Sequence, residues 1–163
     1  MRLGQTEIEI RPDECIRTGQ VQNGYFYILF YAAGTWQARN EGYDETPVIY
    51  CAMPDERNVN NFWGINFNYF TEDVREYIVK GFQTRFDILS EDRRVILDGR
   101  QLYDIYSNMA IGLRCYSRKN VYDCYRVRSQ YLLGYIGLGG KFNMITRRDV
   151  ERSFDLAPGN KGF

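Results

Sequence analysis

The stretch that most constrains the fold of this chain runs from Asn61 to Phe70 and reads Asn-Phe-Trp-Gly-Ile-Asn-Phe-Asn-Tyr-Phe. From Ile65 onward, large apolar side chains alternate with asparagines, which is typical of a half-buried β-strand. A glycine inside a strand, here Gly64, indicates a bulge, a sharp bend or a close approach of another backbone. Thr71 follows and is a suitable helix N-cap. The pattern therefore predicts the last strand of a small sheet, which bends and continues directly into a helix.

Three earlier segments also predict extended structure. Residues 6–11 alternate Ile8 and Ile10 with polar side chains and predict a short strand or an extended arm. Residues 25–31 form an unbroken aromatic and aliphatic run, which favours a buried strand, and residues 46–52 predict the next strand. Because consecutive strands with short connections favour an antiparallel meander, we expect these strands to curl into a small SH3-like half-barrel.

Apolar side chains at helical spacing predict three to four helices after the sheet. These helices are expected to begin near Thr71, Asp98, Tyr122 and Thr146. The predicted fold class is therefore α+β: a small antiparallel SH3-like β half-barrel followed by three to four helices. We expect an N-terminal arm at residues 1–12, a single domain at residues 13–156 and a C-terminal tail at residues 157–163.

The composition excludes several classes of function. Lysine and arginine total 21 and so do aspartate and glutamate, so bulk charge does not attract the chain to nucleic acid or to a membrane. The chain has no histidine, which excludes a Ser-His or Cys-His hydrolase and a zinc site with histidine ligands. The four cysteines lack C-x-x-C spacing, and we expect them to be free core residues in a reducing compartment. We expect no catalytic residue, no metal, no cofactor and no membrane contact.

Basic residues gather in the C-terminal third of this electrically neutral chain. Charge asymmetry of this kind is compatible with a solvated helix face, a protein interface or a surface that contacts DNA. The candidate protein or DNA contacts are Arg114, Arg118, Lys119, Arg126, Arg128, Arg147 and Arg148.

Three motifs carry a resemblance to a known family. They are the aromatic segment Phe26–Tyr31, the Tyr-Asp-x-x-Pro element at residues 43–47 and the Phe-x-Gly-Ile-Asn stretch that begins at Phe62. Together they resemble the N-terminal part of a family of virion structural proteins of tailed phages, some of which are called DNA end protectors. The signature residues are Phe62, Gly64, Asn66, Asn68 and Tyr69. Asn68 stands where the family has histidine, and residues 125–133 match a family helix more loosely.

The resemblance implies a non-enzymatic structural component of a phage particle, made in the host bacterial cytoplasm and located in the virion. As a head–tail connector, neck ring or tail protein, it would form a homo-oligomer, with a ring expected, and would bind portal, connector or tail subunits. Such assembly suits contacts through the arm and the tail, at Ile8, Ile10 and Phe163.

Two alternatives remain open at this point. The first is a DNA-binding protein that protects or caps genome ends, which requires the basic residues to share one surface. The second is a toxin-like nuclease on the same barrel. Without histidine, such a nuclease would need arginine and carboxylate chemistry, for example from Arg126 and Asp44.

Overall fold

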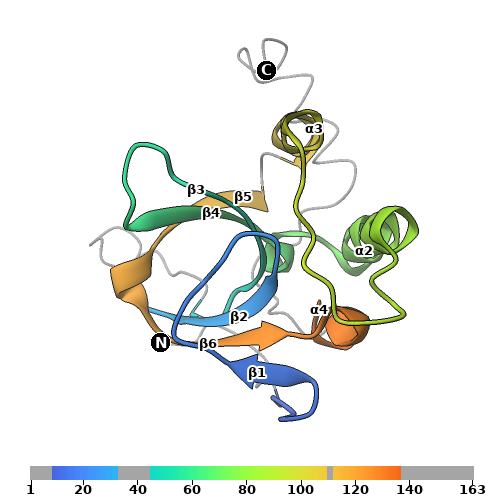
Figure 1. Ribbon diagram of the computed structural model, residues 1–163, viewed down its shortest axis with the longest axis horizontal. Coiled ribbons are helices and arrows are strands. Elements are labelled where there is room, and N and C mark those ends of the chain that lie inside the picture. The colour runs from blue at the N-terminus through green and yellow to red at the C-terminus, as the bar shows by residue number, and fades with distance from the viewer. Residues whose placement is uncertain (1–8, 33–44, 110–111, 137–163) are drawn as a thin grey trace.

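The computed structural model describes residues 9–32, 45–109 and 112–136 (Figure 1). Its centre is a six-stranded sheet in which all paired strands are antiparallel and the strand order is β1-β6-β2-β3-β4-β5. The strands are β1 (Cys15–Arg17), β2 (Phe26–Tyr31), β3 (Val48–Pro54), β4 (Asn61–Asn66), β5 (Leu113–Ser117) and β6 (Val121–Val127).

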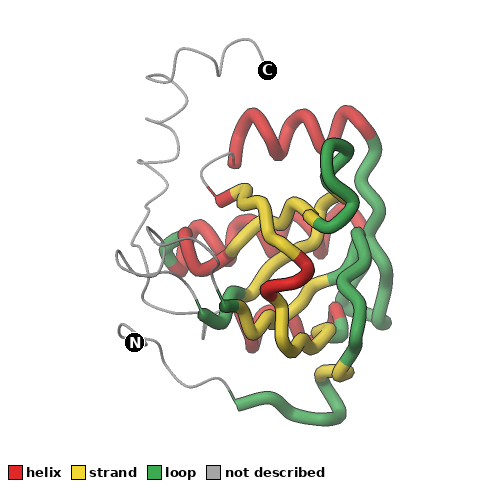
Figure 2. Tube along the Cα trace, turned by 90° about the vertical axis from the view of Figure 1, so that its left-hand side faces the viewer, coloured by secondary structure: helices red, strands yellow, loops and turns green. Residues whose placement is uncertain are grey.

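The helical segments of the described residues lie between β4 and β5, between β5 and β6, and after β6. The α-helices are α2 (Glu72–Phe86), α3 (Gly99–Met109) and α4 (Leu132–Ile136). The short 3-10 helices are η1 (Phe67–Tyr69), η3 (Arg118–Asn120) and η4 (Ser129–Tyr131). In Figure 1 the α-helices lie to the right of the strands, and α3 lies at the top in both Figure 1 and Figure 2. None of these helices has the length and apolar character that crossing a bilayer requires.

Strand β2 is buried on both faces of the sheet. Phe26 and Ile28 point toward the helices, and the Phe26 ring lies 5.4 Å from that of Phe82 on α2. Tyr27 and Leu29 point the opposite way, into a second cluster of buried residues. That second cluster consists of Val21, Tyr27, Leu29, Ile49, Cys51, Phe62, Tyr116 and Cys124. Two-sided burial explains why this segment is an unbroken apolar run, and the strand predicted there is confirmed.

The prediction of an SH3-like half-barrel followed by three to four helices is wrong. The sheet has six strands and is not a closed barrel, and two of its strands, β5 and β6, come after α2 and α3 in the chain. The segment from Tyr122 to Ile136, predicted as one helix, begins as strand β6 and continues through η4 into the short α4. Residues 121–127 form a strand because they hydrogen-bond to β1 on one side and to β2 on the other. These partners lie far away in sequence, and pairing with them outweighs the helix-like spacing of the apolar residues.

The stretch from Asn61 to Phe70 ends its strand earlier than predicted. Strand β4 stops at Asn66, whose side-chain oxygen accepts a hydrogen bond of 2.9 Å from the backbone N–H of Asn68. The chain then forms η1, and α2 begins directly after Thr71, as predicted. Asn66 and Asn68 are both buried, and the Asn68 side chain donates to the Thr46 carbonyl at 3.3 Å. Both side chains therefore bond backbone at the bend.

Gly64 is required for the close packing of β4 on β3. A Cβ at this position would lie 2.9 Å from Cδ1 of Ile49 and 3.4 Å from the backbone oxygen of Tyr50. The closest contact is therefore with a side chain and not with the backbone that the sequence pattern indicated as one possibility. The pairing register of β3 with β4 shifts between Cys51 and Met53, opposite Gly64. The β-bulge therefore lies in β3 and not in β4. Phe62, two residues earlier, is fully buried in the second cluster. Phe62 and Gly64 are therefore part of the packed scaffold.

A buried cation, Arg75 of α2, ties three segments together. Its Nε donates to the Phe70 carbonyl at 2.7 Å, and its Nη1 donates to the Ile136 carbonyl at the end of α4 at 3.1 Å. The side chain is 6% exposed. No sequence pattern marks this residue, because its neighbours Glu72 and Glu76 suggest an ordinary solvated helix face.

Candidate functional site

Arginines gather on the sheet face that the α-helices do not cover. Arg114 and Arg126 each lie two residues from a member of the second cluster, Tyr116 and Cys124, so strand alternation turns them to that face. Arg118 of η3 and Arg94 line a cleft on the same face. We call Arg94, Arg114, Arg118 and Arg126 the arginine face. Three of the four were candidates from the sequence, whereas Arg94 was not.

The other predicted basic contacts are placed differently. Lys119 is exposed in η3. Arg128 follows β6, where its backbone N–H donates to the Glu14 carbonyl at 2.9 Å, and its buried Nε has no hydrogen-bond partner among the described residues. Arg147 and Arg148 lie outside the described residues.

Each guanidinium of the arginine face lies over an aromatic ring, with its Cζ between 4.3 and 5.3 Å from the ring centroid. The pairs are Arg114 with Tyr69, Arg118 with Phe62, and both Arg94 and Arg126 with Tyr25. At these distances the positive charge is attracted to the electron-rich ring. The rings therefore restrict the positions of the guanidinium groups.

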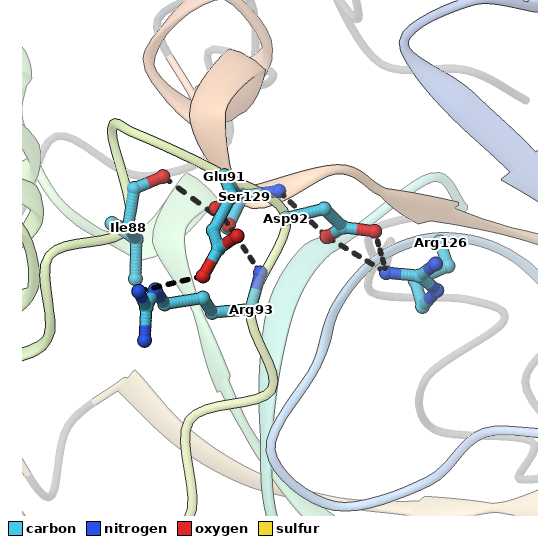
Figure 3. A network of polar contacts seen from close by, with 6 residues as sticks. All are labelled: Ile88, Glu91, Asp92, Arg93, Arg126 and Ser129. Atoms are coloured by element: carbon cyan, nitrogen blue, oxygen red, sulfur yellow. Dashed lines mark hydrogen bonds and ion pairs between the residues drawn. The ribbon is translucent and has the colours of Figure 1, made fainter.

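Arg126 is neutralised by Asp92 (Figure 3). Its Nη1 lies 2.9 and 2.8 Å from the two carboxylate oxygens, and both side chains are about one-fifth exposed. Asp92 also accepts a hydrogen bond of 3.2 Å from the backbone N–H of Ser129. The buried Ser129 hydroxyl in turn accepts from the Arg93 N–H and lies within hydrogen-bond distance of the Glu91 and Ile88 carbonyls. This network fastens residues 88–94 to the end of β6, and it leaves Arg126 unsuited to balance a ligand's charge.

A cleft of about 560 Å³ opens between residues 19–23 and strands β3 and β6. Its lining residues are Gly19, Gln20, Val21, Gln22, Asn23, Cys51, Pro54, Arg94, Arg118, Val121 and Cys124, and none of them is acidic. Arg94 donates to the Asn23 backbone oxygen at 2.8 Å and to its side-chain oxygen at 2.9 Å. Arg118 donates from Nη1 to the Val21 carbonyl at 2.7 Å. We call this site the arginine cleft.

The thiols that line the arginine cleft are not poised for chemistry. Burial raises the pKa of Cys51 to about 12, although the charges of Arg118 and Arg94 act in the opposite direction. Burial and the charge of Asp123 raise the pKa of Cys124 to about 11. Both thiols are therefore protonated at neutral pH and do not act as nucleophiles. All four cysteines are free, as predicted, but Cys115 is exposed and is not a core residue.

Cys115 provides a test of the local electrostatics. Partial burial and the nearby Asp55 carboxylate, 3.9 Å from the sulfur, raise the pKa of this thiol. A raised pKa means less thiolate at pH 8 than an ordinary thiol has, so alkylation by iodoacetamide will be slower than that of free cysteine and will accelerate as the pH rises. Asp55→Asn removes the charge and will speed the reaction at pH 8, while the effect of burial remains.

Mass spectrometry of alkylated peptides measures this rate for each cysteine. Cys15, Cys51 and Cys124 are buried and serve as internal controls, which will react after unfolding in urea. Equal labelling of Cys51 and Cys115 in the native protein would contradict the described packing.

A second groove, of about 390 Å³, lies where the described part of the chain begins and ends. Its lining residues are Glu9, Arg11, Glu14, Gln130, Tyr131, Leu133, Gly134 and Tyr135. The Tyr135 hydroxyl accepts from the Arg11 N–H at 3.2 Å and donates to Glu14 at 2.6 Å. Leu133 is 50% exposed and Tyr131 is 40% exposed. We call this site the terminal groove.

The predicted assembly contacts are only partly described. Ile10 is half-buried and packs against the core of its own chain on the helix side of the sheet. Ile8 and Phe163 lie outside the described residues. Among the residues that are described, no three acidic or cysteine side chains come together in a way that would hold a metal ion.

Comparisons with protein family models, with curated protein sequences and with solved structures found no match for this chain. The resemblance to virion structural proteins therefore stays a prediction that rests on the residues quoted for it. The genome-end-binding and nuclease alternatives stay predictions as well, and Asp44 lies outside the described residues.

Proposed function

We propose that this protein is a non-enzymatic structural component of a tailed phage particle, which works by binding copies of itself and neighbouring particle proteins. The observation that carries the proposal is the terminal groove. Arg11 and Tyr135 are hydrogen-bonded there, so residues 9–11 and 131–136 lie side by side. Two segments far apart in sequence, each leading into one end of the chain, thus share one surface.

The chemistry of the terminal groove suits a protein partner. Protein interfaces combine an apolar or aromatic anchor with a polar rim. Leu133 and Tyr131 are large and exposed, and the groove beside them is polar at Glu9, Arg11 and Gln130. Covering a half-exposed leucine removes apolar surface from water, which favours association by roughly 1 kcal/mol or more.

Leu133→Ser tests the proposal. Sedimentation velocity of the full-length chain over a concentration series, alone and with purified portal, connector or tail subunits, measures association. Because covering Leu133 contributes roughly 1 kcal/mol or more, we expect this variant to weaken association about fivefold or more. Leu89→Ser is the matched control, because Leu89 is 59% exposed but does not line the groove.

Two outcomes would contradict the proposal. One is a chain that stays monomeric at every concentration and with every candidate particle protein. The other is an equal loss of association in the Leu89 and Leu133 variants, since that would show that the terminal groove is not part of the interface.

A further inference from the structure

We propose that the arginine cleft binds the phosphate group of a nucleotide-sized ligand. The inference rests on the placement of Arg94 and Arg118 around one cleft and does not depend on the proposed role in particle assembly. It concerns the sheet face opposite the helices.

Charge in the arginine cleft favours a doubly charged anion. Guanidinium groups stay protonated in proteins, so Arg94 and Arg118 bring two positive charges. None of the lining residues is acidic, and the nearby Asp92 is already paired with Arg126. A phosphate monoester carries a charge of about −1.5 to −2 at neutral pH, whereas one carboxylate carries a single charge. Phosphate therefore matches the two arginines better than a carboxylate does.

The two guanidinium groups are oriented in advance. Arg118 is fixed by the Val21 carbonyl and the Phe62 ring, and Arg94 is fixed by Asn23 and the Tyr25 ring. A guanidinium has five N–H donors, and these contacts leave donors on both groups without a partner among the described residues. Donors that are already ordered lose little conformational entropy on binding, which strengthens the affinity for an anion.

Both arginines also act on the floor of the same cleft. The charges of Arg118 and Arg94 each lower the pKa of Cys51, against the larger effect of its burial. Because Arg94, Arg118 and Cys51 all line one cleft, a phosphate group bound there would be attracted by the positive charge of both guanidinium groups.

The size and lining of the cleft indicate more than a bare phosphate ion. Small-molecule sites usually have volumes of about 300–1,000 Å³, and the arginine cleft has about 560 Å³. Gln20, Gln22 and Pro54 also line the cleft, so polar and apolar residues lie beside the arginines. This combination and the volume suit a phosphate joined to an organic group of the size of a nucleoside.

Isothermal titration calorimetry of the full-length chain tests the inference. The probes are the four common nucleoside monophosphates, the corresponding nucleosides, and inorganic phosphate. We expect at least one nucleotide to bind at least tenfold more tightly than both its nucleoside and inorganic phosphate. Arg94→Gln and Arg118→Gln should each weaken that binding at least tenfold. Arg114→Gln should leave it unchanged, because Arg114 belongs to the arginine face but does not line the cleft.

NMR spectroscopy of the wild-type protein tests the inference without a variant, and so it does not depend on whether a variant folds. Addition of the nucleotide should shift the amide NMR signals of residues 20–23 and leave those of α2 in place. The inference would be overturned if no nucleotide bound more tightly than its nucleoside, or if inorganic phosphate bound as tightly as the nucleotide. An equal loss of affinity in Arg114→Gln would also overturn it, because it would reveal a general charge effect.

Discussion

Arg75→Met will lower the free energy of unfolding by about 4 kcal/mol. The substitution keeps much of the side-chain volume but removes the donors to the buried carbonyls of Phe70 and Ile136. Hydrogen bonds to a charged group contribute about 1.5–3 kcal/mol each, and a buried acceptor that loses its partner adds a desolvation penalty. For a chain of this length we expect the melting temperature to fall by roughly 8–16 °C in a calorimetric scan.

Arg85→Met is the matched control for this prediction. Arg85 belongs to the last turn of the same helix and is exposed, so its replacement should change stability by less than about 0.5 kcal/mol. If the two variants melted at the same temperature, the guanidinium of Arg75 would contribute nothing to the contact between α2, η1 and α4.

Gly24→Ala will destabilise the protein by about 3 kcal/mol, for two independent reasons. Gly24 has a φ of +92°, a conformation that costs an L-residue about 1–3 kcal/mol. A Cβ at this position would also lie 2.9 Å from the Val95 carbonyl oxygen, and the backbone has little room to move because Gly24 is hydrogen-bonded to both Cys51 and Val95. Urea unfolding followed by tryptophan fluorescence measures the loss.

Gly19→Ala is the control, because it adds the same methyl group at a position where no atom lies in the way. Gly19 precedes the same turn, and a Cβ there meets no atom within 4 Å. We expect its stability to stay within about 0.5 kcal/mol of the wild type, or to rise slightly as the unfolded chain loses freedom. Gly24→Ala and Gly19→Ala variants of equal stability would show that residues 19–24 do not hold the described conformation.

The parts of the fold that were predicted correctly have local causes. The helix start expected near Asp98 is an example: Asp98 accepts from the Gln101 N–H at 2.8 Å, and Gln101 accepts from the Asp98 N–H at 2.9 Å. Such a reciprocal pair of hydrogen bonds can be predicted from the sequence, because the two residues are only three positions apart. Strand β2 was predictable for the same reason, because its apolar run consists of adjacent residues, Phe26–Tyr31.

The parts that were not predicted depend on distant partners. Strand β6 pairs with β2 across almost the whole domain, for example Tyr27 with Arg126, and its own sequence also fits a helix. Likewise, the basic candidates Arg118 and Arg126 were visible in the sequence, but the partner that neutralises Arg126 was not. Arg94 joins the arginine cleft because residues 20–23 fold against it, and no local pattern encodes that contact.

The position of β6 has a consequence for how the protein is made. Strand β6 is the last of the described strands in sequence, yet it lies between β1 and β2 in the sheet. Until the ribosome has synthesised residues 121–127, β2 presents an unbroken apolar run with one edge unpaired. Folding must wait for this long-range contact, which makes it slow compared with that of helical domains of the same size. A nascent chain stalled before β6 would be a substrate for chaperones, and strand addition between two such chains would be the main route to aggregation.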